Sequence, residues 1–172
     1  MFQPVAHERE IDFFRLLMSN LMIQTLRFDP ADMPEGDLGL RRLLGIPMPD
    51  RWQLPEAKPQ TIYFATDDFG CSYHWLLLPD TNDALVVGPY FLEEQSETDL
   101  MAILERHRLP PQLLPSLQNY CNTIPLIHQS NLLVMALTTL GEVLWGSQEH
   151  FSMHQVALSP FTFDELPAED RR

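Results

Sequence analysis

The sequence predicts an α+β fold, in which an antiparallel sheet of three to five strands carries helices mainly on one face. Two observations lead to this prediction. Between Thr61 and Leu92, short runs of strand-forming residues alternate with clusters of Asp, Asn, Gly and Pro, which is typical of an antiparallel meander. Before and after this stretch, apolar residues recur every three or four positions, which indicates amphipathic helices.

Length and composition predict one domain, expected to span residues 1–160, followed by a linker or frayed tail over residues 161–172. The chain has 172 residues, of which 45% are hydrophobic, and this is enough for a core without cross-links. The formal net charge is −13, and Lys58 is the only lysine. Nucleic acids and anionic membranes are bound through clusters of Lys and Arg, so we expect this segment to bind neither.

The sequence also favours a cytoplasmic protein without a cofactor. The N-terminus lacks the basic stretch and the following apolar region of a signal peptide. No apolar run approaches the roughly 20 residues that are needed to cross a bilayer. Cys71 and Cys121 are too few and too far apart for a disulfide framework or a Cys-based metal site, so we expect both thiols to be reduced and packed.

Three segments of helical spacing are expected to pack on or beside the sheet. The first is Glu8–Met22. The second follows a capping box at Ser96–Asp99, with Asp in the place of Glu, and reaches about His107. The third is Gln112–Asn122, which requires Pro115 to lie in its first turn.

The strongest predicted helix is Asn131–Trp145. We expect Ser130 to cap its start and Gly146 to end it. Seven apolar positions of this helix are expected to be buried: Leu132, Leu133, Ala136, Leu137, Leu140, Val143 and Leu144.

Three segments have a less definite pattern. Met22–Phe28 either continues the first helix or forms a strand. Residues 30–60 contain six prolines and are expected to form an irregular linker or lid, with a short helical turn around Leu38–Leu44. Phe151–Leu158 alternates weakly and is expected to add an edge strand.

The loops of the meander predict which side chains share a face of the sheet. We take Asp67–Gly70 and Pro79–Asp83 as the two loops. One face then carries Ile62, Phe64, Tyr73, Trp75, Leu77, Leu85 and Val87. The other carries Tyr63, Ala65, Ser72, His74, Leu76, Leu78 and Val86. Because the side-chain period of a strand is two, a slip of one residue would exchange these faces.

The first face is strongly aromatic and is expected to contact the helices. Buried Tyr and Trp side chains need partners for their polar groups. Two interpretations follow: the rings contact a small ligand, or they belong to an ordinary core and bond to backbone carbonyls. Under the first interpretation, the expected ligand-binding residues are Phe64, Tyr73, Trp75 and Tyr90.

Motifs for catalysis or metal binding are weak in this chain. Asp68-Phe69-Gly70 copies the magnesium-binding triplet of protein kinases, but the other kinase motifs are missing, so a turn is the better interpretation. His150 and His154 have the spacing of zinc ligands on a helix, yet they follow the expected helix end and are expected to be solvent-exposed.

Two other groups could carry chemistry only under further conditions. His74 could act as a general base, but no Ser, Cys or carboxylate stands in a recognisable nucleophile motif. Glu93-Glu94 and Glu97-Thr98-Asp99 could bind a cation if a loop brought them together. A solvated helix start, where negative charge is favoured, is the simpler interpretation.

Three segments together resemble the N-terminal sensory region of bacterial AraC-type transcription regulators. They are Ile62–Leu78 with the following VVGPYFLEE, LPPQLLPSLQNYCNTIPLI at Leu109–Ile127, and LLVMALTTLGEVLWG at Leu132–Gly146. The resemblance covers about residues 60–150. It implies a PAS/GAF-like sensor that is joined to two helix-turn-helix units, which this chain lacks. It implies no catalytic residue and assigns no ligand-binding residue.

The resemblance leads to the expectation of a ligand-sensing or dimerisation domain, not an enzyme. Its partners would be an unidentified small-molecule effector and possible second copies of the chain. An effector that prefers one packing of helices on the sheet would reorient the attached DNA-binding part. Two alternatives are a protein-interaction module without a ligand and a small hydrolase or transferase that uses His74 and a carboxylate.

Overall fold

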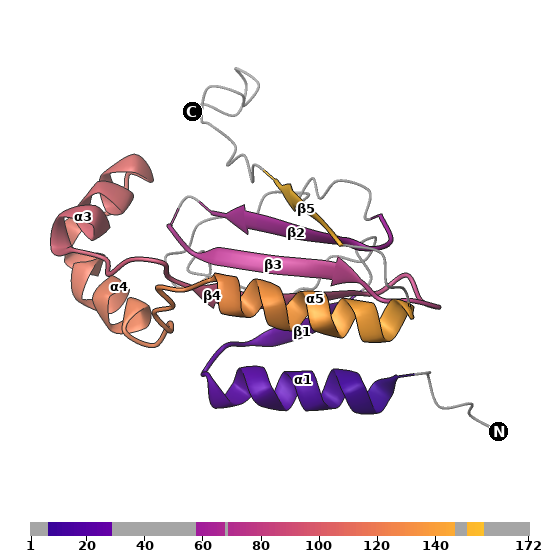
Figure 1. The fold of residues 1–172 in the computed structure, drawn as a ribbon. Coiled ribbons are helices and arrows are strands. Elements are labelled where there is room, and N and C mark those ends of the chain that lie inside the picture. Colours follow the sequence, from indigo (N-terminus) through magenta and orange to yellow (C-terminus); the bar gives the residue numbers. More distant parts are fainter. Residues whose placement is uncertain (1–6, 29–57, 68, 147–150, 157–172) are drawn as a thin grey trace, which may run out of the picture.

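The computed structural model describes residues 7–28, 58–67, 69–146 and 151–156 (Figure 1). The fold is α+β, as predicted. Its elements in chain order are α1 (Glu8–Asn20), β1 (Thr25–Phe28), β2 (Thr61–Thr66), β3 (Ser72–Leu77), β4 (Ala84–Tyr90), α3 (Glu97–Arg106), a 3₁₀ turn (Pro111–Leu113), α4 (Leu114–Cys121), α5 (Asn131–Trp145) and β5 (Ser152–Gln155).

The strands form one open five-stranded sheet in the order β1-β4-β3-β2-β5. Strands β2, β3 and β4 are the predicted meander, and β1 pairs with β4 in antiparallel orientation. The edge strand β5 runs parallel to β2, so the sheet is mixed rather than purely antiparallel. The chain therefore reaches β5 through the helices that follow β4, a crossover that parallel pairing requires.

Local sequence signals account for the start of α3 and the end of α5. The Ser96 hydroxyl accepts a hydrogen bond from the Asp99 N–H, and the Asp99 carboxylate accepts one from the Ser96 N–H, so the predicted capping box is confirmed. Gly146 ends α5 in a left-handed conformation, as predicted. Ser130 was expected to cap α5, but its backbone is already helical and its side chain makes no capping bond, so that prediction is wrong.

The less definite segments are partly resolved by the fold. Residues 25–28 form strand β1, and Phe151–Leu158 contains the expected edge strand. Residues 30–57, including Leu38–Leu44, lie outside the described residues, as do His150 and the tail 161–172. Within the described ranges, no helix combines the length and the apolar character that crossing a membrane demands. Cys71 and Cys121 are free and buried, as expected.

The predicted faces of the meander are wrong because β3 is turned over relative to β2 and β4. Tyr63 lies opposite Trp75, and Phe64 lies opposite His74. On the other side of β3, Trp75 lies opposite Val86 rather than Val87. Tyr73 and Trp75 therefore share a face with Tyr63 and Val86, whereas Phe64 lies on the opposite face of the sheet.

The cause of the error lies in the two turns. The Asp67 N–H donates to the Cys71 carbonyl (2.9 Å), so these residues pair and the loop between them is shorter than the four residues assumed. The Leu78 N–H likewise donates to the Asp83 carbonyl (2.8 Å). Each turn thus shifts the pairing by one residue, which exchanges the side chains of β3 between the two faces.

A bulge in β4 then places Tyr90 on the face opposite Tyr73 and Trp75, with which it was expected to bind a ligand. Ser72 lies opposite Tyr90 and His74 opposite Val87, so β4 has one residue more than β3 between these pairs. The extra residue inverts the alternation of β4 beyond Gly88. Tyr90 therefore lies on the same face as Ser72 and His74.

The two faces of the sheet contribute to two clusters of buried side chains. Helices α1 and α5 cover one face, where they pack on residues such as Ile62, Leu76 and Leu85 (Figure 1). The aromatic face joins the cluster that includes α3 and α4, which lie at one end of the sheet. The expectation that all seven apolar positions of α5 are buried is wrong for Leu132 and Val143, which are exposed.

Candidate functional site

The four predicted ligand-binding residues do not converge on one site. Tyr73 and Trp75 lie in the cluster with α3 and α4. Tyr90 lies in the cluster under α1 and α5, and Phe64 is on that same face beside His74. The register and the bulge separate the two pairs across the sheet, so a single pocket lined by all four rings is not formed.

On the aromatic face, Tyr73 and Trp75 satisfy their polar groups to different degrees. The Tyr73 hydroxyl donates to the Asp67 carboxylate (3.4 Å), and burial is the main reason why the pKa of this phenol lies far above its usual range. The Trp75 ring stacks on Tyr63 with centroids 5.4 Å apart. Its indole Nε1 is buried and has no hydrogen-bond partner in the described part of the molecule. Tyr73 thus bonds to a carboxylate rather than to the expected backbone carbonyl.

On the other face, His74 forms a buried pair with Tyr90. The His74 side chain is 1% exposed, and its Nε2 lies 2.7 Å from the Tyr90 hydroxyl. Burial lowers the pKa of His74 to about 4 and raises the pKa of Tyr90 to about 12, so both groups are neutral at pH 7. The Phe64 ring packs 5.1 Å from the imidazole. His74 is therefore bonded to Tyr90 and shielded from solvent. A histidine in this position is poorly placed to take a proton from a substrate, as a general base would.

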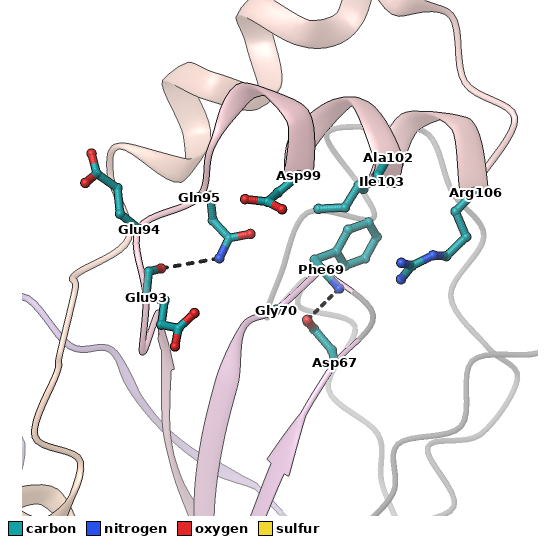
Figure 2. A pocket seen from close by; sticks show the side chains of 10 residues that line it. All are labelled: Asp67, Phe69, Gly70, Glu93, Glu94, Gln95, Asp99, Ala102, Ile103 and Arg106. Atoms are coloured by element: carbon teal, nitrogen blue, oxygen red, sulfur yellow. Dashed lines mark hydrogen bonds between the residues drawn. The ribbon is translucent and has the colours of Figure 1, made fainter.

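A pocket of about 380 Å³ lies elsewhere, at the end of the sheet near α3 (Figure 2). The β2–β3 turn, the segment after β4 and the inner side of α3 surround it. Its lining combines four carboxylates, one guanidinium and a small apolar floor. The residues are Asp67, Phe69, Gly70, Glu93, Glu94, Gln95, Asp99, Ala102, Ile103 and Arg106.

The β2–β3 turn positions the floor of this pocket. The Asp67 carboxylate accepts hydrogen bonds from the backbone N–H groups of Phe69 and Cys71, both at 2.9 Å. This side chain thereby holds the turn in the manner of an Asx motif. Phe69 is buried, and its ring stacks on His107 at the end of α3 with centroids 5.0 Å apart. The turn is thus attached to the helix that forms the opposite wall.

The carboxylates of the pocket are not equally available to a ligand. Asp67 holds the turn and Asp99 caps α3, and the hydrogen bonds from Ser96 lower the pKa of Asp99. Glu93 and Glu94 are exposed. No group of three His, Cys, Asp or Glu side chains with the arrangement of a metal site occurs among the residues that the structure describes. The pocket therefore presents the exposed Glu93 and Glu94 carboxylates and the Arg106 guanidinium beside a small apolar floor.

Part of this pocket was predictable from the sequence. Glu93, Glu94 and Asp99 were expected to bind a cation only if a loop brought them together, and all three line this pocket. Phe69 was expected only as part of a turn, and no sequence pattern indicated Arg106. The β2–β3 turn and the end of α3 lie far apart in the chain, so no local sequence pattern indicates that Phe69 and Arg106 line the same pocket.

Comparisons of this chain with protein-family models, with curated proteins and with solved structures returned no match. The likeness to AraC-type sensors and to PAS/GAF-like folds therefore stays a prediction from the sequence motifs.

Proposed function

We propose that this chain is the regulatory domain of an AraC-type transcription regulator, with ligand sensing or dimerisation as its role. The DNA-binding part would lie outside this chain. The observation that supports the proposal is that the three segments of the resemblance pack into one unit, as parts of a single sensor fold would.

The contacts between these segments are specific. The Phe91 N–H, just after GPY, donates to the Pro125 carbonyl (2.9 Å), and the Ile127 N–H donates to the Phe91 carbonyl (2.8 Å). The segment that ends in IPLI is thereby joined to the end of β4. The Trp145 indole, near the end of α5, donates to the Leu77 carbonyl of β3 (3.1 Å). The second and third segments of the resemblance thus each contact the first, the meander, at a defined point.

Within this proposal, the pocket beside α3 is the effector site. Its exposed Glu93 and Glu94 carboxylates would bind the amine group of a small molecule, and its wall is formed by both the β2–β3 turn and α3. A ligand that binds one arrangement of turn and helix more tightly shifts the population toward it, which is the physical basis of regulation. The effector class is therefore a small organic amine.

A thermal-shift screen with polyamines, amino acids and their amides tests the effector site. A ligand at about 100 times its Kd stabilises the folded chain by about 2.7 kcal/mol, which is a shift of several degrees for a domain of this size. We expect this shift to disappear when Glu93→Gln and Glu94→Gln are combined. Glu105→Gln, which alters an exposed glutamate of α3 that does not line the pocket, is the matched control.

The regulatory role itself is tested by fusing residues 1–172 to a helix-turn-helix unit that binds its operator only as a dimer. We expect repression of a reporter by the fusion and a change in repression on addition of the amine found in the screen. A fusion that is folded and expressed but neither represses nor responds to any amine would contradict the proposal.

A further inference from the structure

We propose that two copies of this chain associate through the outer sides of α1 and α5. This deepens the proposed function, on which it rests for the idea that the chain dimerises, and it assigns that role to a defined surface.

Helix α1 has a second apolar stripe in addition to the one that faces the core. Ile11 and Phe14 are buried, as the amphipathic pattern predicts. Phe13, Leu16 and Leu17 lie on the far side of the helix and are 69%, 60% and 41% exposed. Large apolar side chains that are exposed together on one side of a helix are typical of a surface that binds a partner.

Helix α5 has the same property in a stronger form. Leu132, Met135 and Val143 recur along its solvent side, and each is exposed by about half to two thirds of its surface (63%, 64% and 47%). Glu142 is the only ionisable residue within the helix. The sequence pattern predicted that Leu132 and Val143 would be buried, and association through this side would bury them.

Polar contacts orient the two stripes toward each other. Glu8 forms an ion pair with Arg27 of β1 (2.6 Å), and the Arg15 Nε–H donates to Thr25 (3.3 Å). Because residues 8 and 15 are seven positions apart, they lie on the same flank of α1. Their bonds to β1 hold this flank against the strand. Positions 13 and 17 lie on the other flank, toward α5, which is in contact with α1 (Figure 1).

The opposite side of α5 is fixed in a corresponding way. Trp145 bonds to Leu77 of β3, and Gly141 lies against the Phe151 ring, where an added Cβ would come within 2.6 Å of the ring. These contacts turn one flank of α5 toward β3 and β5, and the exposed stripe is on the flank toward α1. We treat the two stripes as one surface on the outer sides of these two contacting helices, which we call the α1/α5 surface: Phe13, Leu16, Leu17, Leu132, Met135 and Val143.

The size of the α1/α5 surface suits a protein partner. With exposed fractions between 41% and 69%, the six side chains form an apolar area on the order of 600 Å², at the upper end of the roughly 300–600 Å² found for the largest apolar patch of a monomer. It is close to the roughly 800 Å² per partner of a standard interface, to which flanking polar residues also contribute.

The charges on α1 itself do not oppose a second copy as the partner. The chain carries a formal net charge of −13, but the exposed charges of α1 balance, with Arg9 and Arg15 against Glu10 and Asp12. A basic partner would find no concentration of carboxylates here. Two copies related by a twofold axis would bury apolar stripe against apolar stripe.

Sedimentation equilibrium of the full 172-residue chain tests the proposal. We expect a dimer at micromolar concentration that persists in 1 M salt, because apolar burial is not screened. Leu16→Glu combined with Met135→Glu should raise the dimer Kd at least 100-fold. Met153→Glu, which changes an exposed apolar residue of β5 outside this surface, should leave the Kd within about threefold. Circular dichroism checks that each variant folds.

Cross-linking provides a second measurement that does not depend on a destabilised variant. A short bis-maleimide should give a covalent dimer of Met135→Cys and none of Met153→Cys, since Cys71 and Cys121 are buried. A wild-type chain that stays monomeric at 100 µM would overturn the proposal, as would a dimer weakened only by Met153→Glu. Because these assays measure self-association alone, such a failure would still leave the amine screen to decide the sensing role.

Discussion

Protonation of one buried histidine should make the fold sensitive to mild acid. His74 is enclosed by the Phe64 ring and the Tyr90 hydroxyl, and burial lowers its pKa from the ordinary value of about 6.5 to about 4. Between these two values, the unfolded chain binds a proton that the folded chain does not. Stability that is fully present above pH 6.5 is therefore lost as the pH falls toward 4.

The magnitude follows from the two pKa values. Between pH 7 and pH 5, the linkage relation gives a loss of about 2 kcal/mol from this histidine alone. Carboxylates also titrate in acid, so the measured quantity is the difference between wild type and His74→Leu. Urea unfolding followed by circular dichroism at pH 7, 6 and 5 gives the free energy of unfolding of each protein. The variant should lose about 2 kcal/mol less than wild type over this range.

The exposed His128 supplies the matched control. His128→Leu should keep the pH dependence of wild type. If His74→Leu and wild type lose the same free energy between pH 7 and pH 5, then His74 is not held neutral by burial, and the buried His74–Tyr90 pair is described wrongly.

Two further predictions concern the backbone. Gly88→Ala at the bulge should lower the free energy of unfolding by about 2 kcal/mol or more, because φ is +139° and a Cβ would lie 2.7 Å from the Ser72 carbonyl oxygen. Chemical denaturation measures this loss, with Gly146→Ala as the control, since a Cβ at Gly146 meets nothing within 4 Å. A loss for Gly88→Ala no larger than that of Gly146→Ala would contradict the bulge. Ser96→Ala should cost about 1 kcal/mol by removing the cap of α3; equal stability of the variant and wild type in the same assay would show that the cap contributes nothing.

Local patterns in the sequence were sufficient wherever a few neighbouring residues decide the outcome. The capping box at Ser96–Asp99 needs only four residues, and it forms as predicted. Gly146 ends α5 because a left-handed residue is needed at that point and glycine adopts it without strain. The apolar spacing of α1 and the turn residues of the meander likewise predicted helix, strand and the α+β class.

The faces of the sheet depended on the tertiary structure. Both sides of β3 are apolar enough to be buried, so hydrophobicity alone does not choose between the two registers. The hydrogen bond between Asp67 and Cys71 decides the first register, and the bulge at Gly88 decides where Tyr90 lies. For this reason the residues expected to share one ligand site are divided between the two faces.

Helix caps, turn residues and apolar periodicity act over a few bonds, so they predicted the type and order of most elements and left Met22–Phe28 open between helix and strand. Which side chains meet depends on long-range packing. A shift of one residue in a turn exchanges the two faces of a strand at almost no cost in local propensity. The pocket that brings Phe69 and Glu93 together with Arg106, and the exposed sides of α1 and α5, arise from that long-range packing.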